Sequence, residues 1–331
     1  MTKHIVIGGS GFTGTYLVRA LLARGLMVET IDIAPLPNEF EGRVKHYQLD
    51  ILNTHALGEV QLNGDDVVYH LAARQFHNDV PSKGQDEWFA EVNVTGTDNV
   101  LKWMRQLQQP RLVYLSTDMV YGLPEKLPVP PTHRHNPLGP YGRSKAASEK
   151  LCEQARENRF LITILRPRMI VGPGRFGILI KLFRLMDLGL PVPTIGSGRN
   201  RYQMIAVEDV VSAIVATLDK GFPQVALSLG SGDAPAVKDL LRNTIKRIGS
   251  RSLVVPIPAA PLKFTLSMLE KLGMPLLHRE QYQIADVNYV VDISPTHNVL
   301  EWQPSRNDED MLVAAYEHYR ELSATRNGMN N

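Results

Sequence analysis

Short apolar runs alternate with stretches of helical periodicity along most of the chain. The apolar runs predict β-strands at residues 4–7, 27–31, 45–49, 66–70, 111–116 and 225–229. The first of them, His4 to Ile7, is rich in β-branched residues, which is typical of a strand buried on both faces. Helical patterns lie between the strands, including one over 87–108 and one that begins at Tyr141. This alternation predicts an α/β fold with a doubly wound parallel sheet.

The pattern becomes less regular after the predicted strand that ends near Arg166. Here the chain is expected to leave the sheet, and the periodicity predicts helices over 178–188, 237–248 and 262–272. A short strand over 204–207 is expected to return to the sheet. Within the last helix, Met268, Leu269 and Leu272 recur at helical spacing, so we expect them to lie in the core.

The first predicted strand leads directly into the turn Gly8-Gly-Ser-Gly-Phe-Thr-Gly14, and a helix follows. In such a turn Gly8 permits the sharp change of direction, Gly11 lets the backbone approach a pyrophosphate, and Gly14 allows close packing of helix and strand. The free N–H groups and the positive dipole of the helix N-terminus favour phosphate binding. The sequence therefore predicts a dinucleotide site.

Asp32 ends the second predicted strand, about 20 residues beyond the turn, where a carboxylate can accept bonds from the hydroxyls of the adenosine ribose. Because a carboxylate repels a 2′-phosphate and no arginine follows before Arg43, NAD is favoured over NADP. The alternative is a glycine turn that only links strand to helix, with Asp32 as a solvated residue.

A second candidate site combines two hydroxyl side chains with a lysine. Tyr141 and Lys145 are spaced i, i+4, which places both side chains on one face of the predicted helix. Thr117 follows the strand over 111–116, at the sheet edge where a nicotinamide is expected. A Tyr–Lys pair alone is common on solvated helices, so its significance depends on these neighbours.

Together these motifs resemble the extended short-chain dehydrogenase/reductases, specifically the NAD-dependent epimerase/dehydratase family. The resemblance rests on the glycine turn, Asp32, and several further segments. These are His70-Leu-Ala-Ala73, Asn93-Val-Thr-Gly-Thr97, Ser116-Thr-Asp-Met-Val-Tyr-Gly122, Pro140-Tyr-Gly-Arg-Ser-Lys145, Leu165-Arg-Pro-Arg-Met-Ile-Val-Gly-Pro173, Gly196-Ser-Gly198, Val207-Glu-Asp-Val-Val211 and Leu300-Glu-Trp-Gln-Pro304. The resemblance therefore covers nearly the whole chain.

The resemblance implies an enzyme with bound NAD and a set of site residues. Tyr141 would be the acid/base, Lys145 would hold the nicotinamide ribose and lower the pKa of Tyr141, and Thr117 would bond the reacting oxygen. The expected cofactor-binding residues are Gly8, Gly11, Phe12, Thr13, Gly14, Asp32, Asp50, Ile51, Leu71, Ala72, Ala73, Ser116, Tyr141 and Lys145. The expected substrate-binding residues are Thr117, Asp118, Met169, Arg175 and Arg201.

The resemblance also implies a domain division and an assembly. Residues 1–167 and 203–230 would form the NAD-binding Rossmann domain. Residues 168–202 and 231–331 would form a smaller, interleaved substrate-binding lobe. A homodimer would form through the helix that bears Tyr141 and the helix before it.

We interpret the chain as a nucleotide-sugar epimerase that oxidises a sugar hydroxyl transiently to a ketone. One alternative is a dehydrogenase or keto-reductase of the same family, acting on a sugar-nucleotide or resembling the 3β-hydroxysteroid dehydrogenases. Another is an NAD-binding regulator without chemistry. A 4,6-dehydratase is disfavoured because Met119 stands where those enzymes have a catalytic glutamate.

The arginines bear on the substrate. Five of them fall in the two segments expected to frame the substrate pocket, and guanidinium groups suit a diphosphate. They are Arg166, Arg168, Arg175, Arg199 and Arg201. Against a nucleotide-sugar, Met169 replaces an asparagine and Tyr202 an arginine common in sugar-nucleotide members. At least two of the five arginines are expected to form salt bridges instead.

Composition narrows the class of protein. The chain has 331 residues, a net charge of +2 and no long basic run, so nucleic acid is not expected as a partner. The one cysteine, Cys152, is expected to be buried, and the histidines have no spacing typical of a metal site. With no apolar segment long enough for a membrane span and no secretory signal, we expect a cytoplasmic protein.

Overall fold

The computed structural model describes residues 2–76 and 79–328, so residues 1, 77–78 and 329–331 of the assigned domains lie outside it. Its centre is a parallel seven-stranded sheet in the order β10-β6-β5-β4-β1-β2-β3. The strands are β1 (Lys3–Ile7), β2 (Met27–Asp32), β3 (Lys45–Gln48), β4 (Val67–His70), β5 (Arg111–Leu115), β6 (Leu161–Pro167) and β10 (Ala226–Leu229). The predicted doubly wound parallel sheet is confirmed.

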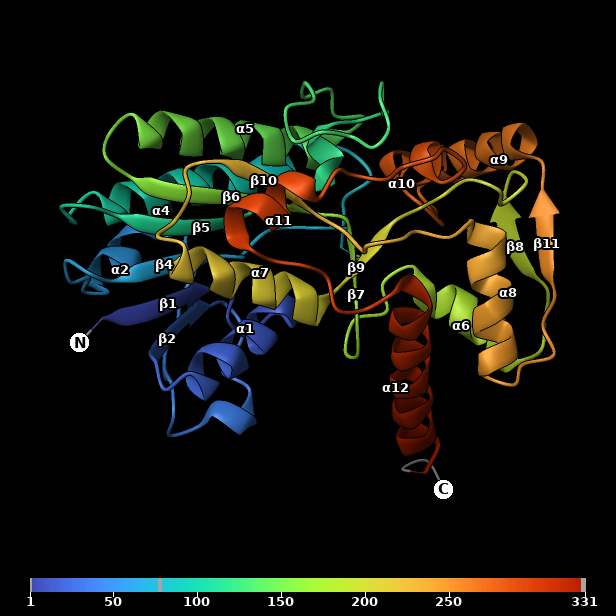
Figure 1. Cartoon of the computed structure of the whole chain (residues 1–331), viewed down its shortest axis with the longest axis horizontal. Helices are drawn as coiled ribbons and strands as arrows, with labels where there is room; N and C mark the ends of the chain where they lie inside the picture. Colours follow the sequence, from blue (N-terminus) through green and yellow to red (C-terminus); the bar gives the residue numbers. More distant parts are fainter. Residues whose placement is uncertain (1, 77–78, 329–331) are drawn as a thin grey trace.

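Helices cover both faces of this sheet (Figure 1). One face is covered by α1 (Phe12–Ala23), α7 (Val207–Asp219) and α11 (Ser294–Leu300). The other is covered by α2 (Thr54–Glu59), α4 (Thr97–Met104) and α5 (Pro140–Arg156). The single helix predicted over 87–108 is divided into α3 (Gln85–Ala90), a π-helical segment η2 (Glu91–Gly96) and α4. Two short 3₁₀ turns are η1 (Asn38–Phe40) and η3 (Asp118–Val120).

The strand order reverses between β1 and β4. From β1 the chain builds outward through β2 and β3, and then returns to place β4, β5 and β6 on the opposite side. Helices that leave neighbouring strands in opposite directions open a crevice at the carboxyl ends of the strands, where α/β proteins bind ligands. The glycine turn after β1 and the segment after β4 meet there, since Ala72 donates its N–H to the carbonyl of Ile7 at 3.0 Å.

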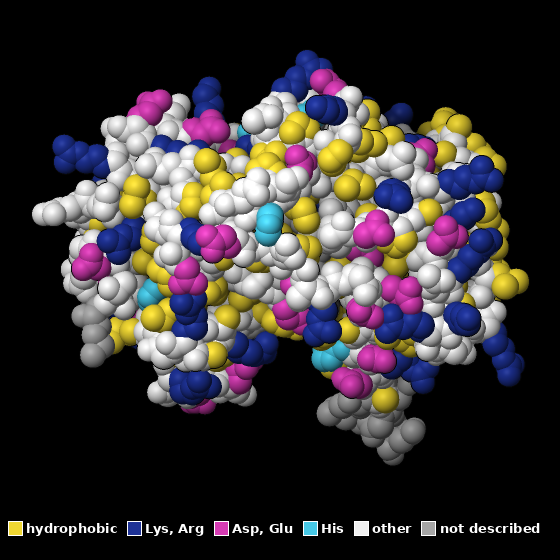
Figure 2. Space-filling model, viewed as in Figure 1, with side chains coloured by type: hydrophobic (Ala, Val, Ile, Leu, Met, Phe, Trp, Pro, Cys, Tyr) yellow, Lys and Arg dark blue, Asp and Glu magenta, His cyan; other side chains and the backbone are white. Residues whose placement is uncertain are grey.

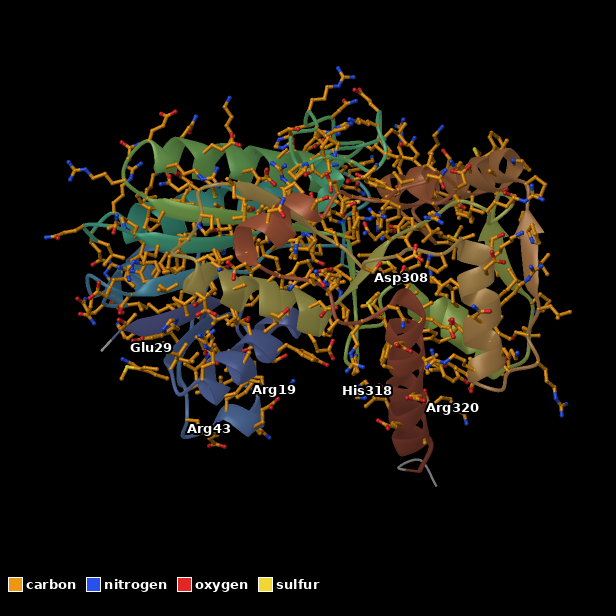
Figure 3. All side chains as sticks on the ribbon, viewed as in Figure 1. Arg19, Glu29, Arg43, Asp308, His318 and Arg320 are labelled. Carbon is orange, nitrogen blue, oxygen red and sulfur yellow. The ribbon has the colours of Figure 1, made fainter. Side chains whose placement is uncertain are left out.

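A smaller lobe stands beside the sheet on the side of β7 (Met169–Val171) and β9 (Met204–Ala206) (Figure 1). Its elements are α6 (Leu179–Asp187), β8 (Val192–Ile195), α8 (Val237–Arg247), β11 (Val254–Ile257), α9 (Ala259–Lys271), α10 (Arg279–Ile284) and α12 (Asp308–Gly328). Its core joins α6, α8 and α12 through buried side chains such as Phe183, Leu240 and Met311. At its rim Arg320 of α12, labelled in Figure 3, pairs with Asp187.

Charged side chains of both signs lie side by side over the face of the molecule seen in Figure 2. Many charged side chains form exposed ion pairs, such as Arg24 with Asp219 and Arg247 with Asp310. Exposed pairs of this kind contribute about 0–1 kcal/mol each. The fold therefore depends on its buried interactions.

Two expectations about the later part of the chain are wrong. The strand β9 (Met204–Ala206) pairs with β7 (Met169–Val171) in a separate two-stranded sheet and does not return to the central one. In the central sheet β6 is paired on both sides, with β5 and β10, so it offers no free edge to β9. In α9, Met268 is 42% exposed and Leu272, just beyond the helix, is 64% exposed. Only Leu266 of this helix is buried, because α9 lies at the surface of the lobe.

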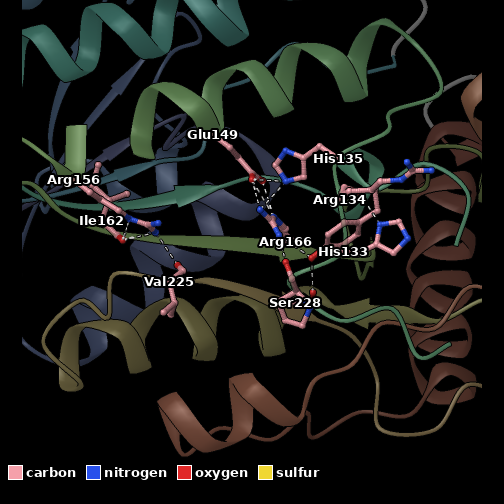
Figure 4. A network of polar contacts seen from close by, with 11 residues as sticks. His133, Arg134, His135, Glu149, Arg156, Ile162, Arg166, Val225 and Ser228 are labelled. Atoms are coloured by element: carbon pink, nitrogen blue, oxygen red, sulfur yellow. Dashed lines mark hydrogen bonds and ion pairs between the residues drawn. The ribbon is translucent and has the colours of Figure 1, made fainter. Parts of the chain in front are cut away.

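A buried ion pair fastens α5 to β6 (Figure 4). The Nε of Arg166 donates to both carboxylate oxygens of Glu149, at 2.9 and 3.1 Å. The side chains are 4% and 0% exposed. Nη1 of Arg166 donates to the hydroxyl of Tyr121 at 3.0 Å and to the carbonyl of Pro131 at 2.7 Å, while Nη2 lies 2.9 Å from Nε2 of His135. One guanidinium thus joins the helix, the sheet and the proline-rich segment between them.

We predict that Arg166→Met destabilises the protein by about 3–5 kcal/mol, because it leaves the carboxylate of Glu149 buried without its partner. The free energy of unfolding from urea denaturation measures the loss. Arg24→Met, which removes an exposed pair, is the matched control and should cost less than about 1 kcal/mol. Equal losses in the two variants would contradict the prediction.

Candidate active site

A cavity of about 500 Å³ lies at the carboxyl ends of β1, β2 and β4. Its wall contains most of the residues predicted to bind the cofactor. They are Gly8, Gly11, Phe12, Thr13, Gly14, Asp32, Asp50, Ile51, Leu71, Ala72 and Ala73. Residues far apart in sequence therefore meet at this edge of the sheet, as expected for parallel strands.

The glycine turn forms one wall of this cavity and fits the diphosphate of a dinucleotide. A Cβ on Gly14 would lie 2.0 Å from the carbonyl oxygen of Gly8, so only glycine permits this close packing. Gly8 itself has φ +87, which other residues rarely adopt. Helix α1 begins here without a side-chain cap and without an acidic residue in its first turn. Its free N–H groups and positive end are thus available to an anion.

Asp32 lies at the end of β2 and lines the same cavity as the glycine turn. Its Oδ2 accepts the N–H of Ser10 in the glycine turn at 3.0 Å, and its Oδ1 accepts the N–H of Ala34 at 3.0 Å. These two bonds fix the carboxylate beside the turn. A ribose in this cavity would meet an oriented acceptor.

A second cavity, of about 190 Å³, adjoins the first. Both are lined by Leu71, Ala73, Gln75, Leu115 and Arg175. The second cavity is lined by the other predicted site residues except Arg201. They are Ser116, Thr117, Asp118, Tyr141, Lys145, Met169 and Arg175. The residues predicted for catalysis therefore gather next to the first cavity, which is lined by the residues predicted to bind the cofactor and is called the cofactor cavity below.

Tyr141 is the second residue of α5 and is 8% exposed. Its ring packs edge-on against Phe76 and Phe89, with centroids 5.5 and 5.7 Å away. Burial raises the pKa of Tyr141 above its usual value, and the positive charge of Arg175 opposes this increase. Thr117, at the end of β5, caps η3 by accepting the N–H of Met119 at 3.2 Å.

Lys145 lies one turn further along α5 and is also buried. Its Nζ donates to the carbonyl of Leu115 at 2.7 Å and lies 4.2 Å from the centroid of the Tyr114 ring. Burial lowers the pKa of Lys145 to about 7, while the carboxylate of Glu149 opposes the decrease. The ammonium group is thus fixed at the end of β5, next to the cofactor cavity.

Asp118 lines the second cavity, but its carboxylate is paired with the buried guanidinium of Arg168. Arg168 is held between the rings of Tyr202 and Tyr289, with centroids 4.5 and 4.0 Å from its Cζ. The Nη2 of Arg168 has no hydrogen-bond partner among the described residues. Arg168 and Asp118 therefore form a rigid unit at the end of the cavity.

The five arginines do not form one group. Arg166 and Arg168 are buried in ion pairs, as expected for at least two of the five, and Arg199 is exposed. Arg201 does not line either cavity, since its side chain is 60% exposed and lies 3.8 Å from Asp233. Arg175 lines both cavities, and its Nη2 donates to the side chain of Gln75.

The model of the NAD-dependent epimerase/dehydratase family matches residues 4–230. The chain belongs to this family. It is therefore an enzyme, an extended short-chain dehydrogenase/reductase, and its cofactor is NAD. The family resemblance seen in the sequence is confirmed.

Three relatives illustrate the range of the family. The UDP-glucose 4-epimerase of Vibrio cholerae is 26% identical over 310 residues, which cover 92% of each chain. A 3β-hydroxysteroid dehydrogenase/decarboxylase of Arabidopsis thaliana is 28% identical over 342 residues, covering 91% of this chain and 75% of that protein. The structure of UDP-glucuronic acid 4-epimerase from Bacillus cereus, in complex with UDP-glucuronic acid and NAD, superimposes with a TM-score of 0.76. It is 24% identical and covers 97% of this chain and 100% of that one.

Several residues of this epimerase/dehydratase site were not predicted from the sequence. Gln75 and Phe76 follow the His-Leu-Ala-Ala strand end closely, so their position in the chain was a usable signal. Arg168 was expected among the arginines that frame the substrate pocket, whereas Tyr202 was noted only as the replacement of an arginine; both line the second cavity. Gln281 and Ile284 come from α10 and lie more than 100 positions after Thr117, Tyr141 and Lys145 in the sequence. No motif marks them.

No group of three or more histidine, cysteine, aspartate or glutamate side chains in residues 2–76 and 79–328 is arranged to hold a metal ion. No helix in these ranges is long and apolar enough to cross a membrane. Cys152 is buried, as expected.

We predict that Asp32→Ala weakens NAD binding about tenfold, since it removes a charged acceptor from the ribose side of the cavity. The affinity for NADP should fall less, so that the preference for NAD decreases. Fluorescence titrations with both cofactors measure these dissociation constants. Asp65→Ala, at an exposed residue paired with Arg111, is the control. An unchanged ratio of the two constants in Asp32→Ala would contradict the prediction.

Proposed function

We propose that this enzyme is a nucleotide-sugar epimerase that oxidises a ring hydroxyl to a ketone and then reduces it again. The observation that carries the proposal is the meeting of Thr117, Tyr141 and Lys145 in a cavity that adjoins the glycine-lined cavity. A phenol, a hydroxyl and an ammonium group at one point suit the removal of a proton from an alcohol.

Bound NAD supplies the hydride acceptor for this reaction. Tyr141 takes the proton of the substrate hydroxyl while the carbinol hydrogen leaves with its electron pair, and a carbonyl group forms. Thr117 would bond the reacting oxygen, and Lys145 would hold the nicotinamide ribose. After the ketone had turned in the cavity, Tyr141 would give the proton back as the carbonyl is reduced from its opposite face. No net oxidation results.

The relatives support a sugar-nucleotide substrate, because both a sequence relative and a structural neighbour are named as epimerases of UDP-sugars. Arg175 supports it as well, since this guanidinium lines both cavities. Dehydration remains disfavoured. Met119 carries no group that can take a proton from carbon, and the carboxylate of Asp118 is engaged by Arg168.

A second candidate is an NAD-dependent dehydrogenase or keto-reductase that acts on an apolar alcohol. The observation that favours it is the apolar wall of the second cavity, to which Phe76, Met119, Met169, Phe176 and Ile284 contribute. Since Arg166 and Arg168 are engaged in buried pairs, a diphosphate would find fewer cations than the sequence suggests. The Arabidopsis relative is named as a steroid dehydrogenase. A regulator without chemistry is disfavoured by the intact catalytic group.

The division of the chain is also part of the proposal. We place NAD binding in 1–167 and 203–230, and substrate binding mainly in 168–202 and 231–331. Residues of the second lobe support this, because Phe176, Gln281 and Ile284 line the catalytic cavity. A homodimer through α5 and α4 stays a prediction.

We predict that the enzyme epimerises a sugar-nucleotide with no sustained change of absorbance at 340 nm, since the hydride returns to the same substrate. NMR spectra of the protein with UDP-, GDP-, CDP- and dTDP-sugars would detect the epimer. Steroid alcohols, tested with added NAD, address the second candidate. Continuous NADH formation would contradict the epimerase and support the dehydrogenase.

Tyr141→Phe is expected to lower turnover by about 10²–10⁴-fold, because it removes the acid/base and little else. NAD affinity should change less than about threefold, because the ring that packs against Phe76 and Phe89 is retained. Tyr47→Phe, in β3, is the matched control and should keep full activity. Retained turnover in Tyr141→Phe would exclude Tyr141 as the acid/base.

A further inference from the structure

The helix that carries Tyr141 begins without a cap of its own. Its N-cap residue is Gly139, which has no side chain, and its first residue is Pro140, which has no N–H. The N–H groups of Tyr141 and Gly142 follow, and helix geometry gives neither an acceptor within the helix. A buried helix end of this kind needs an acceptor from elsewhere in the fold.

That acceptor is Glu280, in α10 of the second lobe. Its Oε1 accepts the N–H of Tyr141 at 3.0 Å and its Oε2 accepts the N–H of Gly142 at 3.1 Å. The residue is 1% exposed. We propose that Glu280 is a positioning residue: it caps α5 from the substrate-binding lobe and thereby fixes Tyr141 in its catalytic place. This inference rests on the proposed role of Tyr141 as the acid/base.

The backbone around the carboxylate is shaped to admit it. A Cβ on Gly139 would lie 2.3 Å from both the Cγ and the Oε1 of Glu280. A Cβ on Gly142 would lie 3.2 Å from Oε2 and 2.7 Å from the carbonyl oxygen of Met119. Side chains at these two positions would displace the glutamate. The absence of side chains at Gly139 and Gly142 therefore leaves room for the carboxylate of Glu280.

Helix α10 also forms part of the cavity wall beside Tyr141. Gln281 and Ile284 line the catalytic cavity. His278, the N-cap of α10, stacks on Phe76 with centroids 4.6 Å apart, and Phe76 packs edge-on against Tyr141 at 5.5 Å. Movement of α10 would thus shift both the backbone and the ring contacts of Tyr141. The cap couples the position of the substrate-binding lobe to the catalytic group.

The charge of Glu280 acts on Tyr141 as well. Burial has the largest effect and raises the pKa of Tyr141, while the positive charge of Arg175 lowers it. The carboxylates of Asp118 and Glu280 raise this pKa further, and a hydrogen bond with Thr117 lowers it. Removing the charge of Glu280 therefore lowers the pKa of Tyr141. A purely structural contact would not have this effect.

Glu280 itself titrates in the neutral range. Burial raises its pKa to about 7, although the N–H groups of Gly142 and Tyr141 and the charge of Arg143 oppose the increase. Asp86 adds to the increase. Because Tyr141 has a pKa far above that of Glu280, the glutamate is charged wherever Tyr141 ionises. Below about pH 7 the cap carries a proton and binds the two N–H groups less strongly.

The test compares Glu280→Gln with the unchanged protein and with Asp209→Asn. Asp209 in α7 is also buried and also accepts two backbone N–H groups, those of Ser305 at 2.9 Å and Arg306 at 3.1 Å. In Glu280→Gln, amide hydrogen exchange at Tyr141 and Gly142 should be about tenfold faster, the size expected for loss of a helix cap. In Asp209→Asn the exchange of these two amides should not change.

A second variant separates the position of the carboxylate from its charge. Gly139→Ala keeps Glu280 but pushes it from the helix end, and the backbone of Gly139, with φ −156, accepts alanine. We expect the same faster exchange in this variant. With isotopically labelled glutamate, NMR should show one carboxyl group titrating near pH 7 that is absent in Glu280→Gln, and the Tyr141 and Gly142 amides should follow the same midpoint.

Turnover gives the final readout. With the sugar-nucleotide that the enzyme epimerises, Glu280→Gln should lower kcat about ten- to hundredfold with little change in KM, because a small misplacement of the catalytic group costs this much. Because Tyr141 acts as a base when the alcohol is oxidised, the rising limb of the pH–rate profile, which follows its ionisation, should move to lower pH. Unchanged exchange in both variants, or an unmoved profile, would overturn the role of Glu280. If no substrate is turned over, the proposed function fails, while the exchange data still decide whether Glu280 holds Tyr141.

Discussion

The structure depends on the buried ion pair between Glu149 and Arg166. Tyr141, Lys145 and Glu149 are spaced by four residues along α5, so all three face the sheet. Burying a carboxylate costs several kcal/mol unless it is paired, and Arg166 of β6 provides the pairing. The same carboxylate opposes the effect of burial on the pKa of Lys145. One ion pair thus holds α5 in register with the sheet and keeps the lysine closer to its charged form.

The fold and the cofactor cavity followed from local sequence. The glycine turn, Asp32 and the small residues after β4 are each recognisable within a few positions, and parallel strands bring their carboxyl ends to one edge. The strand order then fixes which ends meet. For this reason the cavity lined by the predicted residues from Gly8 to Ala73 could be expected without knowing any long-range contact.

The remaining features depend on contacts that sequence patterns do not encode. Asp118 and Arg168 pair across 50 positions, and Glu280 reaches Tyr141 across 139. A guanidinium suits a phosphate and a carboxylate equally well, so the arginine cluster could not be divided into ion pairs and ligand contacts beforehand. Periodicity shows which face of a helix is apolar but not what covers it, which is why the exposure of Met268 was missed. The pairing of β9 with β7 was missed because the short strand shows no preference for a partner.

The ion pairs that build the site also limit what it can accept. Arg168 is held by Asp118 and by two tyrosine rings, so its guanidinium cannot turn toward a diphosphate without breaking a buried pair. Arg175 is then the guanidinium that borders both cavities in the described part of the chain. It is bonded to Gln75, a neutral partner that a phosphate or carboxylate can displace at lower cost. Under the proposed function, substrate choice would therefore depend on the apolar wall for shape and on Arg175 for charge.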